Sequence, residues 1–116
     1  MRHPKQQRII KFLHYLVHSS SKERVKLLEL ASPTIIHLIS QLCLNLLHNK
    51  IKVPSNCVSK LKRYKKEIKQ LGNGRNIESN RRVLLQKGGA AVVPIILSTV
   101  GSLIAPILAS LLQKRE

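Results

Sequence analysis

The chain has 116 residues, enough for one small domain and an appendage, and its two cysteines exclude a disulfide framework and fit a reducing compartment. It contains 21 Lys or Arg but only five Asp or Glu, for a formal net charge of +16 at pH 7. Ordinary soluble domains carry net charges of about 2–8 in magnitude. This excess therefore indicates a polyanionic partner, either nucleic acid or an anionic membrane. The alternative is a basic surface that only keeps the protein soluble.

The first two predicted elements are short helices. Pro4 suits the first turn of the first helix, and Ser20 with Glu23 forms a capping-box pair that opens the second. The first helix has its apolar residues on one arc of a helical wheel and its basic residues on the other; the apolar ones are Ile9, Ile10, Phe12, Leu13, Leu16 and Val17. This pattern predicts one face packed on a core and a basic face in water.

The third predicted helix, residues 33–49, is the most apolar element before the paired glycines. Ser32 and Pro33 are its N-cap and its first helical residue. Because its apolar residues cover about half of its circumference, we expect it at the centre of a small bundle. Cys43 lies in this apolar run and is expected to be a small core residue.

Two further helices are predicted before the paired glycines. The fourth is capped by Ser55 or Asn56, runs to about residue 71, and is ended by Gly72-Asn73-Gly74. A short fifth helix, residues 77–87, leads to Gly88-Gly89. No β-type alternation appears along the chain.

These elements predict an all-α fold: a small basic four- or five-helix bundle followed by a C-terminal hydrophobic helix that prolines interrupt. The predicted parts are a helical bundle over residues 1–72, a basic linker and short helix over 73–89, and a hydrophobic tail over 90–116.

The densest positive charge lies between residues 60 and 87. Lysine predominates there, and lysine acts as a point charge suited to phosphates; Tyr64 is the only aromatic residue nearby for stacking. We therefore predict non-specific binding to the backbone of double-stranded DNA, with anionic lipid headgroups and a solvated helix face as alternatives. The predicted binding residues are Lys60, Lys62, Arg63, Lys66, Lys69, Arg75, Arg81, Arg82 and Lys87.

The tail has no charged residue from 88 to 113 and is long enough to span a bilayer at ~1.5 Å per residue. Three arrangements are open: insertion into a membrane, packing into a protein assembly, and burial within its own domain. The residues expected to leave water are Val92, Val93, Pro94, Ile95, Ile96, Leu97, Leu103, Ile104, Pro106, Ile107 and Leu108. If the tail itself carries the function, the alternative is a membrane-active or tail-anchored protein that acts on an anionic intracellular membrane.

Gly88-Gly89 is either a helix stop and hinge or a protease recognition site. Three stretches, "ASPTIIHLISQLCLNLLHNKI", "SKLKRYKKEIKQL" and "RRVLLQKGGAAVVPIILSTVGSLIAPILASLL", resemble the small basic proteins of Polinton/Maverick elements and adintoviruses. The order of a basic stretch, Gly-Gly and an apolar tail also resembles the precursor of the adenovirus mu core peptide.

The resemblance implies a minor virion core protein that condenses packaged double-stranded DNA, located in the virion core and the host nucleus. It also implies capsid proteins as partners and maturation by an adenovirus-type cysteine protease, with Gln86, Lys87, Gly88 and Gly89 at the matching positions. Gln86 stands where that protease prefers a large aliphatic residue.

Catalytic and metal-binding patterns are weak. His14 and His18 lie four residues apart, a spacing that metals use, but no third ligand of the right kind is nearby, so we expect a surface pair. No acids are paired at catalytic spacing, and Cys57 has no adjacent histidine to activate it. We expect no enzyme, no cofactor and no metal.

Overall fold

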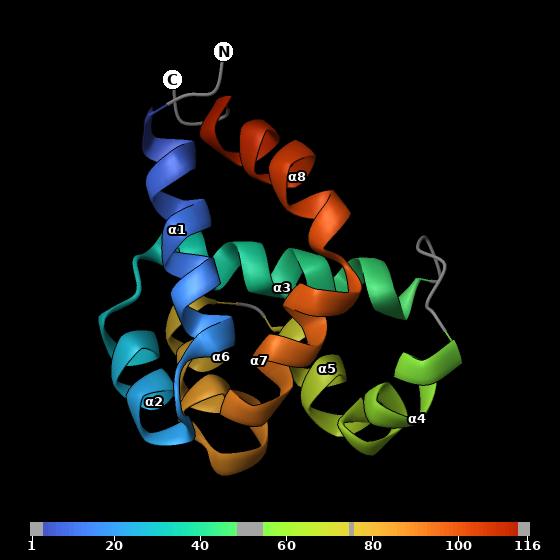
Figure 1. Cartoon of the computed structure of the whole chain (residues 1–116). Helices are drawn as coiled ribbons and strands as arrows, with labels where there is room; N and C mark the ends of the chain where they lie inside the picture. The colour runs from blue at the N-terminus through green and yellow to red at the C-terminus, as the bar shows by residue number, and fades with distance from the viewer. Residues whose placement is uncertain (1–3, 49–54, 75, 114–116) are drawn as a thin grey trace.

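The structure, a computed structural model, describes residues 4–48, 55–74 and 76–113, and within these ranges the chain is all-helical. The predicted all-α class is therefore confirmed. The helices in these ranges, shown in Figure 1, are α1 (Pro4–His18), α2 (Ser21–Leu30), α3 (Pro33–Leu47), α4 (Ser55–Arg63), α5 (Lys65–Gly72), α6 (Ile77–Leu85), α7 (Lys87–Thr99) and α8 (Gly101–Gln113).

Local side-chain chemistry sets the starts of α2, α3 and α6. The Ser20 hydroxyl accepts a hydrogen bond from the Glu23 N–H at 3.2 Å and donates one to Glu23 Oε1 at 2.9 Å. Ser32 accepts from the amide of the third residue of α3 at 3.4 Å, with proline at the first position. Asn76 Oδ1 accepts from the Ser79 N–H at 2.7 Å. The caps predicted at Ser20 and Ser32 are confirmed, and each satisfies an N–H that has no partner within its helix.

The predicted central position of α3 agrees with the structure. Eight of its residues are buried, among them Leu38 and Cys43, and the helix contacts α5, α6, α7 and α8. The Ser40 hydroxyl donates to the Leu71 carbonyl at 2.7 Å, which ties α3 to the end of α5. A Cβ at Gly72 would lie 2.6 Å from Leu47 Cδ1, so glycine allows this close approach.

Buried residues of the apolar tail belong to the same core as those of the other helices. α7 contacts each of the other seven described helices, and α8 packs on α1, α3 and α7. In the described residues the tail packs against the other helices of its own chain. Among the predicted tail residues, Val92, Val93, Ile96, Leu97 and Leu108 are buried, Pro94, Ile95, Ile104 and Ile107 are half-buried, Pro106 is exposed, and the Leu103 side chain is outside the described residues.

Two predicted helix boundaries are wrong. The fourth helix is interrupted at Tyr64, which has φ −108° and ψ 21° and separates α4 from α5. The fifth helix ends at Leu85, and Gln86 adopts an extended conformation with φ −73° and ψ 156°. Gly88 and Gly89 therefore do not stop a helix but lie in the first turn of α7.

The break in the tail lies between its two prolines. Pro94 and Pro106 are inside α7 and α8, whereas the chain bends by 102° between Ala90–Thr99 and Ile104–Ser110. Val100, with φ −115° and ψ 24°, caps α7 at this bend. In the described ranges no single helix is long and apolar enough to cross a bilayer, and two bent pairs, α2 with α3 and α7 with α8, qualify by length and composition alone.

Candidate nucleic-acid interface

The most concentrated positive charge in the described chain lies on α4 and α5. We call its six cations, together with the helices that carry them, the α4–α5 surface; they are Lys60, Lys62, Arg63, Lys65, Lys66 and Lys69, and all six are exposed. Within residues 55–72 they are opposed only by Glu67, so this stretch carries six minus one, or +5. Such a surface can neutralise several phosphates at once without reading bases.

The packing of α4 and α5 explains why these cations point to water. Ile68 and Leu71 are buried, Leu61 and Tyr64 pack partly against the core, and α5 contacts α3 while α4 contacts α7. Among its described residues α4 has none that is fully buried. These apolar residues hold the two helices on the core. The rest of each helix surface faces water and carries the lysines.

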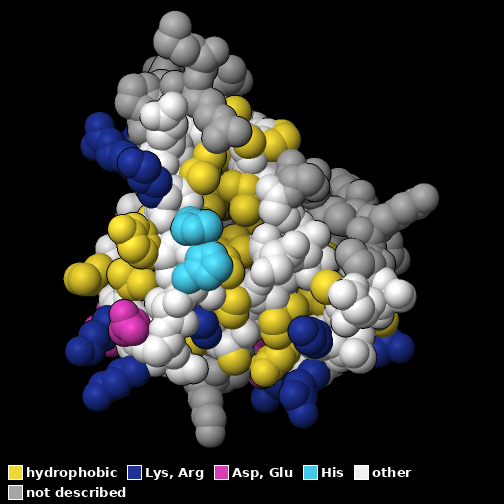
Figure 2. Space-filling model, in the orientation of Figure 1, with side chains coloured by type: hydrophobic (Ala, Val, Ile, Leu, Met, Phe, Trp, Pro, Cys, Tyr) yellow, Lys and Arg dark blue, Asp and Glu magenta, His cyan; other side chains and the backbone are white. Residues whose placement is uncertain are grey.

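The other predicted binding residues are divided between surface and interior. Arg82 is exposed, and Arg81 is half-buried. Arg75 and the side chain of Lys87 lie outside the described residues. In the face drawn in Figure 2, most Lys and Arg side chains lie near the margin and hydrophobic side chains occupy the middle.

Arg81 has a structural role that its place in the sequence does not reveal. Its Nη1 donates to the Leu28 carbonyl at 2.8 Å and to the Glu29 carbonyl at 3.2 Å, at the end of α2. Arg24, which is 9% exposed, does the same for α1: its guanidinium donates to the Leu16 and Ser19 carbonyls at 3.0 and 2.8 Å. The last carbonyls of a helix lack partners within it and carry its negative dipole end, so a guanidinium stabilises both termini.

Arg81 and Arg82 therefore form a matched pair for mutation. We expect Arg81→Gln to lower the free energy of unfolding by about 1–3 kcal/mol, because helix-end carbonyls lose a charged donor. Arg82→Gln should change it by less than about 0.5 kcal/mol, as exposed substitutions do. Urea unfolding followed by circular dichroism measures both. Equal stability of the two variants would show that Arg81 is not a cap.

A groove lies between α4 and α7, beside the α4–α5 surface. Its lining residues are Ser59, Lys60, Arg63, Tyr64 and Ile95, and its volume is about 520 Å³. Lys60 and Arg63 are exposed, while Tyr64 and Ile95 are half-buried. The groove therefore combines two cations with an aromatic ring and an aliphatic side chain.

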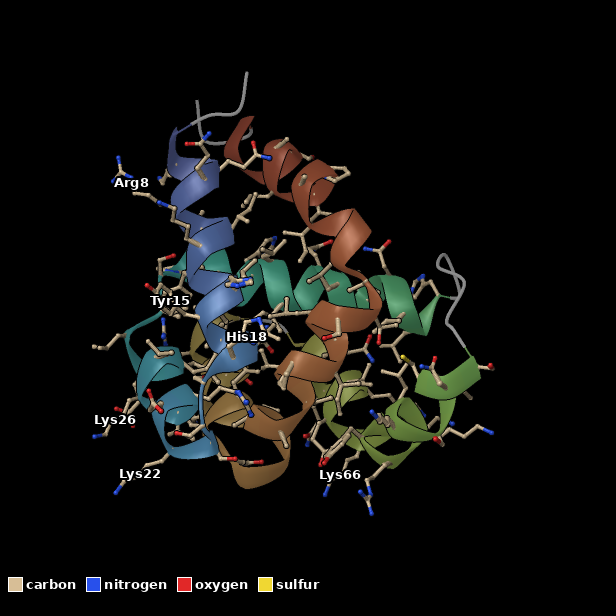
Figure 3. The ribbon with its side chains drawn as sticks, viewed as in Figure 1. Arg8, Tyr15, His18, Lys22, Lys26 and Lys66 are labelled. Atoms are coloured by element: carbon tan, nitrogen blue, oxygen red, sulfur yellow. The ribbon has the colours of Figure 1, made fainter. Side chains whose placement is uncertain are left out.

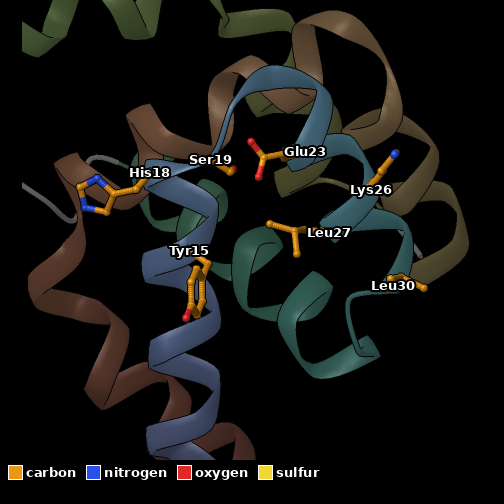
Figure 4. A pocket seen from close by; sticks show the side chains of 7 residues that line it. All are labelled: Tyr15, His18, Ser19, Glu23, Lys26, Leu27 and Leu30. Atoms are coloured by element: carbon orange, nitrogen blue, oxygen red, sulfur yellow. The ribbon is translucent and has the colours of Figure 1, made fainter.

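A second groove, between α1 and α2, is less suited to an anion. It encloses about 380 Å³, and Figure 4 shows the side chains that line it: Tyr15, His18, Ser19, Glu23, Lys26, Leu27 and Leu30. Leu30 is 83% exposed, and the groove carries charges of both signs. This groove escaped prediction because it depends on how α1 and α2 meet.

The candidate catalytic and metal-binding side chains are two histidines of α1 and the two cysteines. The rings of His14 and His18 are both exposed, with centroids 4.5 Å apart. The described residues contain no group of three or more His, Cys, Asp or Glu that could hold a metal ion. Cys43 is fully buried, as predicted, and burial raises the pKa of its thiol to about 12, so it stays protonated at neutral pH. Cys57 is half-buried.

The Gly-Gly site is held in a helix. The Ala90 N–H donates to the Gln86 carbonyl at 3.0 Å, and Ala90 is 4% exposed. The bond between Gly89 and Ala90 therefore lies within the first turn of α7. A protease that requires an extended substrate reaches it only after this turn opens. Two glycines weaken the turn, because glycine is a poorer helix former than alanine.

Comparisons with protein-family models, with curated proteins and with solved structures found no match to this chain.

Proposed function

We propose that this chain is a non-catalytic minor core protein of a Polinton-like virus. In this role it binds the backbone of double-stranded DNA without sequence preference, for genome packaging or for attachment of the genome to capsid proteins. The observation that carries the proposal is the α4–α5 surface, with six exposed cations and one acid in residues 55–72. The viral setting rests on the resemblance of the three sequence stretches quoted above.

Lysine on helices favours phosphates over bases. A lysine ammonium is a point charge with no planar fork for a base edge, and five of the six cations on the α4–α5 surface are lysines. Figure 3 shows Lys66 extending away from the fold, as a side chain free to reach a phosphate does. This chemistry supports contacts to the phosphates of the DNA backbone and not to base edges, so affinity should depend mainly on salt.

Salt dependence tests the proposal with the full chain. We expect unrelated duplexes of equal length to bind within about threefold of one another, and log affinity to fall with log salt at a slope of about −5 if six cations each neutralise one phosphate. Fluorescence anisotropy of labelled duplexes between about 50 and 200 mM salt measures both quantities. Absence of binding at the lower salt concentration would refute the DNA proposal.

The membrane alternative is tested with the same preparation. It is favoured by the bent α7–α8 pair, which is long and apolar enough to enter a bilayer, but it requires Val92, Val93 and Ile96 to leave the core. Leakage of vesicles rich in phosphatidylserine, at protein concentrations that bind no duplex, would support it. Intact vesicles together with tight duplex binding would refute the membrane alternative and support the DNA proposal.

A further inference from the structure

The groove between α4 and α7 has the size of a ligand site and carries two cations. Its volume of about 520 Å³ is within the range of about 300–1,000 Å³ that small-molecule sites occupy. It is open to solvent through two exposed cations, Lys60 and Arg63, which lie one helical turn apart on the same face of α4. A phosphate at the mouth of the groove can therefore contact both.

The interruption at Tyr64 keeps a carboxylate out of this groove. In an unbroken helix, Glu67 would follow Lys60, Arg63 and Tyr64 on one face, at spacings of seven, four and three residues. Instead α4 ends at Arg63 and α5 begins at Lys65, Glu67 is not among the lining residues, and its Oε2 is buried. The groove thus keeps two positive charges with no acid lining it.

The inner part of the groove suits the flat face of a base. Tyr64 and Ile95 line it, both are half-buried, and Tyr64 packs partly against the core, which holds its ring in place. Stacking on an aromatic side chain is a main contact by which proteins hold single strands, and it tolerates any base because every base has a flat face. A base within a duplex cannot use this surface, because its faces are already stacked on neighbouring pairs.

We propose that this groove binds one unpaired nucleotide, with the phosphate on Lys60 and Arg63 and the base against Tyr64 and Ile95. The ligand class is single-stranded DNA, as found at a frayed end or a gap. The proposal rests on the proposed DNA-binding function and adds to it a site that distinguishes unpaired from paired strands.

Tyrosine fluorescence gives a direct test with the full chain. The protein has two tyrosines and no tryptophan, so Tyr15→Phe leaves Tyr64 as the only strong fluorophore. We expect a single-stranded oligothymidylate of about eight nucleotides to quench this fluorescence, and an abasic strand of the same length not to. Equal quenching by both strands, or none by either, would overturn the proposal.

Mutation of Tyr64 supplies the second readout. Tyr64→Leu keeps an apolar side chain against the core but removes the ring, and we expect it to weaken oligothymidylate binding about tenfold while duplex affinity is unchanged. Tyr64→Phe should bind as the wild type does. The matched control is Tyr15→Leu, at a tyrosine that is 69% exposed on α1 and does not line this groove.

The outcomes separate this site from the proposed function. If duplexes bind but Tyr64→Leu binds oligothymidylate as well as the wild type does, the nucleotide site is refuted and the DNA-binding proposal stands. If the full chain binds no duplex at low salt, the DNA-binding proposal is refuted. The quenching titration with oligothymidylate then decides whether the groove binds a nucleotide. If Tyr64→Leu does not fold, as judged by circular dichroism, the fluorescence titration of Tyr15→Phe decides by itself.

Discussion

A chain that ends at Gly89 is expected to lose its cooperative fold. Beyond that residue, five side chains in the described part of the chain are fully buried: Val92, Val93, Ile96, Val100 and Leu108. Burial of an aliphatic side chain contributes about 1.5–3 kcal/mol, so their removal costs about 7–15 kcal/mol. That loss is as large as the whole stability of a typical domain, about 5–15 kcal/mol.

The packing of α1 makes this expectation stronger. Its buried residues Ile9, Leu13 and Leu16 belong to the common core, and its main contacts are with α7 and α8. Removal of residues 90–116 would leave α1 without these partners and would uncover the side of α3 that α7 and α8 cover. The remaining helices are short, and helices of this length are not stable alone in water.

Urea unfolding followed by circular dichroism measures the effect. We expect a single sigmoidal transition for the full chain and a gradual, non-cooperative loss of signal for the chain that ends at Gly89. Ile96→Ala should lower the free energy of unfolding by about 2–5 kcal/mol. Ser98→Ala, at an exposed position on the same helix, is the control and should change it little. A cooperative transition in the truncated chain would show that the tail is separable after all.

DNA binding is not a suitable readout of this truncation. Residues 1–89 retain 19 Lys or Arg and four Glu, a charge of +15, so they should bind duplexes even when unfolded. Cleavage after Gly89 would therefore convert a folded protein into two products: a basic chain without a stable core, and an apolar peptide. Such maturation would unfold the DNA-bound protein and would not merely remove a separate appendage from it.

Local chemistry was sufficient to predict the fold class and several helix starts. Ser20 and Ser32 act on amide groups three residues away, and their hydrogen bonds form as the sequence indicates. The break at Tyr64 could not be predicted in the same way, because the sequence around it contains neither glycine nor proline. The cap formed by Arg81 joins residues more than fifty positions apart and depends on how α6 meets α2.

The position of the tail was the hardest feature to predict. Its uncharged run resembles a membrane segment by composition, so insertion into a membrane and packing into an assembly were left open beside burial. In the structure the tail is a central part of the core, since α1 packs mainly on α7 and α8. Hydropathy measures how favourable the transfer of a segment out of water is. It does not distinguish transfer into a bilayer from burial in a protein core.

The second large effect is expected from three lysines of the α4–α5 surface. In the variant Lys62→Gln, Lys66→Gln, Lys69→Gln, each substitution removes an exposed charge and leaves the buried residues of α4 and α5 in place. If all three contact phosphates, the salt slope should become less steep by about 2.7, and affinity at about 0.1 M salt should fall by roughly 10²–10³-fold.

A second triple variant separates a localised interface from a general effect of net charge. Lys11→Gln, Lys22→Gln, Lys26→Gln removes the same charge from exposed positions on α1 and α2. Figure 3 shows Lys22 and Lys26 extending from α2 at a different part of the molecule from Lys66. An interface on the α4–α5 surface predicts that only the first variant loses about half of its salt slope, since a distant charge is screened beyond about 10 Å at 0.1 M salt. Equal losses in both variants would mean that DNA is held by the charge of the whole protein and not by one surface.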